Sequence, residues 1–142
     1  SSAQEEEIVM KTTGRTPDLP RGTLDRAAFL ALRDVVYAAP VAPSVASRAV
    51  GLCRSSRPEE KQATAFVRQY VAWGAGPRGS QNLVLAAKAR ALLDGRAAPT
   101  TTDVMAVATP ILRHRVLPNH RALSDGVTAD KIVAQLLSET AV

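Results

Sequence analysis

Hydrophobic residues recur at helical spacing along most of this chain. Near its start, Phe29, Leu32 and Val36 follow one another at intervals of three and four positions, which places side chains on one helix face. Thr23 precedes them as the expected N-cap, and Pro40 interrupts the pattern. The pattern therefore predicts a helix that begins at Thr23 and has one buried stripe.

Four further stretches predict helices by the same criterion. One begins at Pro43, which suits a first helical turn, and ends at about Arg57; its expected buried face comprises Val45, Ala49, Leu52 and Cys53. Another spans about 80–94 and is apolar on most sides, which favours a place in the middle of a bundle. The remaining two start at 99–103 and near Thr128, where capping residues precede apolar ones.

The stretch from Phe66 to Trp73 fits two kinds of structure. Phe66, Tyr70 and Trp73 are spaced as on a helix face, whereas the alternation of apolar and polar residues also fits a short strand. Three of the five aromatic residues of the chain lie here. We expect them to cover the core rather than to stack nucleic-acid bases, because only Arg68 supplies positive charge nearby.

Composition narrows the fold class. Hydrophobic residues make up 46% of the 142 residues and aromatic residues only 4%, so the core must consist of Ala, Val and Leu. Such a core favours packed helices over a β-sandwich. We therefore expect an all-α bundle of about five helices, with one very short strand pair as its only β structure. The polar stretches 58–65 and 116–126 are expected to be loops.

Several protein classes are excluded by what the sequence lacks. A single cysteine, Cys53, excludes an internal disulfide framework and a Cys-rich zinc site, and we interpret it as a small core residue. No apolar run approaches the roughly 18 residues of a transmembrane helix, and residues 5–7 are acidic where a secretory signal would be positive. His114 and His120 lack the spacing of a zinc-protease motif. We expect a cytoplasmic protein with no membrane segment, no metal site and no complete active site of its own.

Charge is distributed unevenly along the chain. The net charge is +5, but residues 41–122 carry twelve Lys or Arg and four Asp or Glu, a net charge of +8. Fourteen of the eighteen basic residues are Arg, which favours two-pronged recognition of phosphate or carboxylate. A basic middle indicates either an anionic partner, such as nucleic acid, a nucleotide phosphate or an acidic protein face, or an ordinary solvated surface.

One glycine-rich loop combines features of an anion-binding site. Residues 74–79 read GAGPRG and directly precede the apolar helix predicted at 80–94. Glycine lets the backbone approach a ligand closely, and proline suits a helix start. Arg78 would extend from a helix N-terminus, whose partial positive charge favours an anion, and its planar guanidinium suits a polyphosphate. The loop alone has low specificity, because many Gly-Pro-Arg turns are only turns.

Three separated motifs extend this loop into a family resemblance. The sequence GAGPR, followed by NLVLAAKARALLDGR, precedes PILRHR at 110–115 and DGVTADKIV at 125–133. In this order and spacing the motifs closely resemble the C-terminal lid of MoxR-type AAA+ ATPases, and the first looks like the family's sensor-2 element. The opening QEEEIV resembles the segment just after the family's nucleotide-binding core. Gly79 replaces the usual Ala and Ala98 an often larger apolar residue, which are departures from the pattern.

The resemblance implies a division of the chain and a set of site residues. Residues 1–22 would be a connecting arm from an ATPase core outside this sequence, and residues 23–142 the helical lid. The lid would close over ATP, whose Mg²⁺ is held by that core. Gly76, Pro77 and Arg78 would lie at the nucleotide, and Arg78 would be the sensor-2 arginine that contacts the γ-phosphate during hydrolysis.

The same resemblance implies a chaperone-like remodelling function. The partners would be the ATPase core, the neighbouring subunits of a ring and von Willebrand factor A-type proteins. The chain alone is expected to bind ATP weakly and to hydrolyse none. His114 and Arg115 also match the family, but we interpret them as groups that satisfy the last carbonyls of a helix.

Two alternative functions stay open at this point. One is a basic helical module that binds nucleic acid, which the scattering of basic residues through apolar helices disfavours. The other is a structural domain that binds a protein partner, in which Arg78 is only a turn residue.

Overall fold

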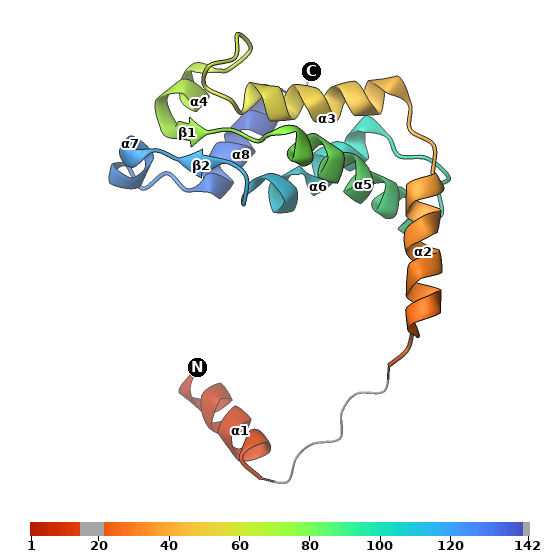
Figure 1. Ribbon diagram of the computed structural model, residues 1–142. Helices are drawn as coiled ribbons and strands as arrows, with labels where there is room; N and C mark the ends of the chain where they lie inside the picture. The colour runs from red at the N-terminus through yellow and green to blue at the C-terminus, as the bar shows by residue number, and fades with distance from the viewer. Residues whose placement is uncertain (15–21, 141–142) are drawn as a thin grey trace. The chain divides into compact units, whose positions relative to one another are not determined.

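The computed structural model describes residues 1–14 and 22–140 (Figure 1). The described residues form eight helices and one pair of short strands. The fold is therefore predominantly all-α, as composition predicts. Residues 15–21, which belong to the arm predicted at 1–22, lie outside the described residues.

The chain divides into two compact units, Ser1–Ala31 and Leu32–Val142. In the first unit, helix α1 (Ser2–Thr12) begins with a capping box in which the side chains of Ser1 and Gln4 satisfy each other's backbone N–H groups. No residue of α1 is buried. The acid-rich start of the chain is thus an exposed helix.

Helix α2 (Arg26–Ala38) begins later than predicted. The carboxylate of Asp25 accepts a hydrogen bond of 2.7 Å from the backbone N–H of Ala28, which is the geometry of an N-cap. The prediction that Thr23 caps this helix is therefore wrong. Asp25 stands directly before the first helical residue and reaches the free N–H group that Thr23 cannot.

Most apolar side chains of α2 are left uncovered by the described residues. Phe29 is 61% and Leu32 53% exposed, Val36 is partly buried, and no residue of α2 is fully buried among those described. The predicted buried stripe is therefore wrong for this chain. Helical spacing correctly identifies the amphipathic helix, but it carries no information about whether a partner covers the apolar face.

Four helices of the second unit enclose the core (Figure 1). Helix α5 (Pro77–Leu93) packs against both α3 (Pro43–Ser55) and α6 (Thr101–Leu112), and α8 (Ala129–Glu139) packs against α3 and α6. Burial of apolar side chains is the main driving force of folding. The apolar side chains buried in this core are small or aliphatic. The largest fully buried ones are Leu52, Leu83, Leu112, Ile132, Leu136, Val67, Val104 and Val133.

These helices confirm the main sequence predictions. The predicted face of α3, including Cys53, is buried. Thr100 and Asp103 form a capping box at the start of α6, and Thr128 caps α8. After α5, Gly95 adopts a positive φ of 73°. The N–H of Arg96 donates to the carbonyl of Ala91, as in a Schellman motif.

The ambiguous stretch 66–73 contains both structures that its pattern allows. Helix α4 (Ala65–Tyr70) leads directly into strand β1 (Val71–Trp73), which pairs antiparallel with β2 (Leu117–Pro118). Helix α7 (His120–Ser124) follows β2, so the loop predicted at 116–126 is wrong. Pairing with a distant strand and capping by Asn119 create order that local composition does not reveal.

The aromatic residues of this stretch fall into two environments. Phe66 and Tyr70 pack against the core, with ring centroids 4.8 Å apart, as expected. Trp73 is 74% exposed and does not cover the core. The expectation for Trp73 is therefore wrong. Regular alternation would place Trp73 on the same face as the buried Val71, but the pairing with β2 is irregular between these two residues, and the alternation is lost there.

No single helix among the described residues is both long and apolar enough to cross a membrane. Only α2 and α3 taken together reach the required length and composition, and they are bent by 96° at their junction.

Candidate functional site

The glycine-rich loop is shorter than predicted, because helix α5 begins at Pro77 rather than at Ser80. Gly76 is the N-cap, with φ −81° and an extended ψ, and Pro77 occupies the first helical position, where its missing N–H costs no hydrogen bond. Arg78 therefore lies in the first turn of a helix of 17 residues. A side chain at this position extends from a regular, well-defined backbone.

Arg78 is exposed, and within residues 1–14 and 22–140 its guanidinium makes no hydrogen bond or ion pair. Most other arginines of the second unit are bound to carboxylates or backbone carbonyls: Arg54, Arg57, Arg68, Arg90, Arg96, Arg113 and Arg121. The positive end of the α5 dipole adds to the charge of Arg78. The first turn of α5 thus offers a cation, reinforced by the helix dipole, to an anion from outside.

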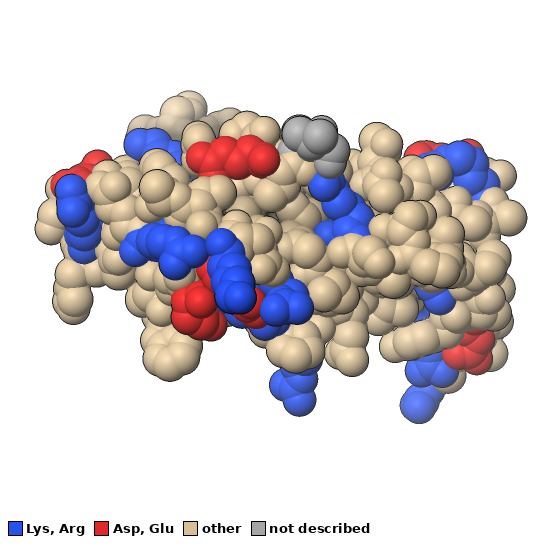
Figure 2. Space-filling model, turned by 90° about the horizontal axis from the view of Figure 1, so that it is seen from above, with Lys and Arg blue, Asp and Glu red and all other residues tan. Residues whose placement is uncertain are grey.

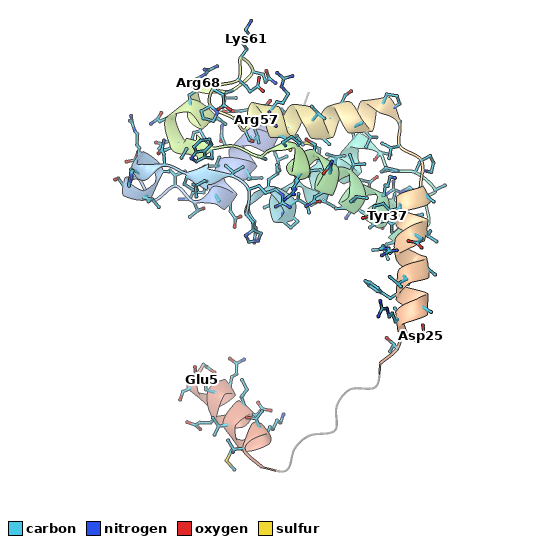
Figure 3. The ribbon with its side chains drawn as sticks, in the orientation of Figure 1. Glu5, Asp25, Tyr37, Arg57, Lys61 and Arg68 are labelled. Atoms are coloured by element: carbon cyan, nitrogen blue, oxygen red, sulfur yellow. The ribbon has the colours of Figure 1, made fainter. Side chains whose placement is uncertain are left out.

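The loop before Arg78 is fixed by the end of helix α3. Ala75 is buried, and its N–H donates to Ser56 Oγ at 2.9 Å. Its carbonyl accepts from Nε of Arg57 at 2.8 Å. Arg57, labelled in Figure 3, follows the end of α3. Both backbone groups of Ala75 are therefore satisfied by side chains from a segment almost twenty residues away.

Close packing leaves no room for a side chain at Gly74 and little at Gly79. A Cβ added to Gly74 would lie 2.6 Å from the carbonyl carbon of Ser56 and 2.7 Å from Cα of Arg57. One added to Gly79 would lie 3.0 Å from Sγ of Cys53. Glycine at position 74 thus allows the loop to lie directly on the backbone after α3.

An open groove of about 720 Å³ adjoins Arg78. It lies between the end of α2, the outer side of α3 and the first half of α5, and is mostly apolar. Lys88 Nζ donates to the carbonyl of Tyr37 at 2.9 Å, which ties the end of α2 to α5. The groove is lined by Tyr37, Ala46, Val50, Arg78, Ser80, Gln81, Asn82, Val84 and Leu85.

Arg115 lies closer to this site than its sequence position indicates. It follows the end of α6, and its backbone N–H bonds to the carbonyl of Leu112 at 2.8 Å. Its side chain packs beside the first turn of α5, so that Cδ would lie 3.6 Å from a Cβ on Gly79. Its Nε is buried without a partner among the described residues. His114, by contrast, is exposed.

Cys53 is fully buried beneath the same turn, which confirms its interpretation as a core residue. Burial raises the pKa of its thiol, although a hydrogen bond with Ser80 and the charges of Arg57 and Arg115 oppose that effect. A neutral buried thiol is a poor nucleophile. In the described part of the chain, no three His, Cys, Asp or Glu side chains gather as metal ligands would.

Comparison with known proteins gives a consistent picture. The family model described as AAA lid domain matches residues 63–136. Chaperone MoxR1 of Mycobacterium tuberculosis is 28% identical over 140 residues, which is 99% of this chain and 37% of that protein. Protein MoxR of Paracoccus denitrificans is 51% identical over 43 residues, or 30% of this chain and 13% of that protein.

A solved structure shares the fold. The crystal structure of a protein from Cytophaga hutchinsonii superimposes with a TM-score of 0.80 at 21% identity. The match covers 99% of this chain and 43% of the other. The chain thus spans less than half the length of each of these relatives.

Proposed function

Because the chain belongs to the AAA lid domain family and is the lid of a MoxR-type AAA+ ATPase, we propose that it closes over core-bound ATP with Arg78 on the γ-phosphate. The observation that carries this proposal is the exposed guanidinium of Arg78 in the first turn of α5, held by no partner in the described chain. Gly76 and Pro77 set the direction of that turn.

The chemistry of phosphoryl transfer explains why an arginine serves here. Negative charge spreads over the equatorial oxygens of the transferred group, and a rigid guanidinium fork can donate two hydrogen bonds to them. Arg78 stabilises that charge from the lid side, assisted by the dipole of α5. The stabilisation matters most in the transition state, so Arg78 affects turnover more than ground-state binding.

The rest of the machinery belongs to the core. Mg²⁺ held by the core would neutralise charge on the phosphates, and residues 1–14 and 22–140 contain no group of side chains that could hold it. Residues 1–22 connect the lid to that core, and residues 23–142 form the moving domain. The chain alone therefore hydrolyses no ATP.

Closing of the lid links nucleotide state to mechanical output. When the angle between lid and core changes, the neighbouring subunits of a ring shift in position. Through this movement the ATPase would remodel its client proteins as a chaperone. From the family resemblance we further propose von Willebrand factor A-type proteins as partners and the cytoplasm as the location of the ATPase.

A nucleic-acid-binding module is the less favoured function. Figure 2 shows basic side chains spread over one face with acidic side chains beside several of them, not gathered in one stripe. Several arginines are neutralised by ion pairs, such as Arg54 with Glu60 and Arg113 with Asp130. Tight binding of generic duplex DNA that weakens steeply with salt would favour this alternative.

Association with a core tests the proposal directly. The purified chain is mixed with the isolated core domain of a MoxR-type ATPase, with and without ATP, and binding is measured by calorimetry. We expect ATP to strengthen association and Arg78→Ala to reduce that increase. Association that is equal with and without ATP would instead support a structural domain in which Arg78 is only a turn residue.

A further inference from the structure

The end of helix α3 makes two contacts with the loop that precedes Arg78, and neither side chain belongs to the nucleotide site described above. Ser56 is fully buried; its hydroxyl donates to the carbonyl of Cys53 at 2.7 Å and accepts from the N–H of Ala75 at 2.9 Å. Arg57 Nε donates to the carbonyl of Ala75 at 2.8 Å. The peptide groups on both sides of Ala75 are therefore fixed.

Only Gly76 and Pro77 separate the fixed residue Ala75 from Arg78. Gly74 lies against the backbone of Ser56, and Ala75 is fully buried. Gly76 then caps α5, and the N–H of Gly79 bonds to the carbonyl of Gly76 at 2.8 Å. No flexible link separates Ala75 from the first turn of α5, so displacement of Ala75 moves the base of the Arg78 side chain.

Arg57 is itself held in place at its far side. Its Nη1 lies 3.4 Å from Glu60, whose carboxylate also receives two hydrogen bonds from Arg54, at 3.0 and 2.8 Å. The side chain of Arg57 is about a quarter exposed, at 23%, whereas that of Arg54 is half exposed. Arg54 and Arg57 thus share one carboxylate, but of the two only Arg57 donates a hydrogen bond to the loop. This difference supplies a matched control.

We propose that Ser56 and Arg57 are positioning residues that set the orientation of Arg78 toward the nucleotide. The inference rests on the proposed role of Arg78. It adds the two residues through which the end of helix α3 fixes the position of that arginine. Arg57 acts by fixing the peptide of Ala75, not by touching the nucleotide. A displacement of about 1 Å at a charge-stabilising group lowers a rate by up to about a hundredfold.

A double-mutant cycle in the full-length ATPase tests the proposal. The variants are Arg57→Ala, Arg78→Ala, the double variant and the control Arg54→Ala, each measured for kcat, for KM for ATP and for thermal unfolding. We expect Arg57→Ala to lower kcat about tenfold to a hundredfold with KM changed by less than about threefold. Arg54→Ala should leave kcat unchanged, and the double variant should be no slower than Arg78→Ala.

The outcomes separate this proposal from the one on which it rests. Suppose that Arg78→Ala lowers kcat and that the double variant lowers kcat by the full product of the two single effects. Arg57 then does not act through Arg78, and the positioning role is overturned. If Arg78→Ala itself leaves kcat unchanged, the sensor-2 role and the positioning role both fall. If Arg54→Ala lowers kcat as much as Arg57→Ala does, the proposal is also contradicted. The effect would then come from Glu60, the carboxylate that both arginines share.

A conservative variant covers the case in which Arg57→Ala does not fold. Arg57→Lys keeps a positive charge but cannot donate to Ala75 and Glu60 with one planar group. We expect a folded variant with kcat between those of the wild type and Arg78→Ala. A wild-type kcat in Arg57→Lys would overturn the requirement for the guanidinium.

Discussion

The hydroxyl of Ser56 and the backbone N–H of Ala75 form a buried hydrogen bond of 2.9 Å that joins the end of helix α3 to the start of the Arg78 loop. The same hydroxyl donates to Cys53, so one oxygen links two backbone segments. Because the bond is inaccessible to water, its loss leaves a buried N–H without a partner.

Replacing Ser56 by Ala should lower the free energy of unfolding by about 1–3 kcal/mol, the usual penalty for a buried unsatisfied polar group. Ser55→Ala is the matched control, since Ser55 is also buried but makes no hydrogen bond to the loop in the described residues. Chemical denaturation of the purified variants measures both. Equal losses at the two positions would contradict the role of the Ser56 bond.

Gly74→Ala should destabilise the chain through steric conflict. The added methyl group would lie within 3 Å of the backbone at Ser56 and Arg57, which cannot move without displacing the end of α3. Overpacking of this kind costs about 1–3 kcal/mol. Gly51→Ala is the control, because a Cβ there meets nothing within 4 Å and alanine favours the helix. A melting temperature for Gly74→Ala equal to that for Gly51→Ala would refute the close contact.

Asp103 should make stability depend on pH. It is 3% exposed, and it accepts hydrogen bonds from Arg96 and from the backbone and hydroxyl of Thr100, which hold the pKa of its carboxyl well below the usual range. Because the folded pKa is depressed, its contribution to stability is complete above about pH 4, the unfolded value, and declines as pH falls toward the folded value.

The variant Asp103→Asn checks this assignment. Its free energy of unfolding at pH 7 should be about 3 kcal/mol lower than that of the wild type. This difference should shrink on acidification to pH 2, and urea unfolding at each pH measures it. Asp94→Asn, which removes the more exposed partner of Arg96, should lose less. A difference that stays constant between pH 7 and pH 2 would show that the carboxylate charge is not what stabilises the site.

The purified chain should bind ATP only weakly and hydrolyse none. The nucleotide contacts proposed for it are limited to the first turn of α5, and the described residues contain no cluster of acidic side chains for Mg²⁺. Calorimetry with ATP and a phosphate-release assay check the two statements. Turnover well above a buffer blank, lost on mutation of a residue of this chain, would contradict the division of labour between lid and core.

The sequence pattern predicts the four core helices α3, α5, α6 and α8 well, because each buries a face whose residues recur at helical spacing. The buried face of α3 and the caps Thr100 and Thr128 are examples. What the pattern cannot reveal is the partner of a face. The apolar side chains of α2 look like a core stripe, yet Phe29 and Leu32 are exposed in this chain. Strand β1 likewise depends on pairing with β2, more than forty residues away.

The candidate site could be predicted only in its local part. Glycine, proline and arginine before an apolar helix indicate the Arg78 turn, because all of their signals lie within a few residues. The support from Ser56 and Arg57 depends on a contact across 18 or 19 residues, so no local signal reveals it. The position of Arg115 beside α5 was missed for the same reason.

The central claim, that Arg78 stabilises charge on the transferred phosphate, is tested most directly by the turnover of Arg78→Ala in the full-length ATPase. We predict that kcat falls by about a hundredfold or more while KM for ATP changes only several-fold, as for removal of a charge-stabilising donor. Arg121→Ala, which removes an exposed arginine paired with Asp125, should retain wild-type turnover. An unchanged kcat in Arg78→Ala would contradict the account.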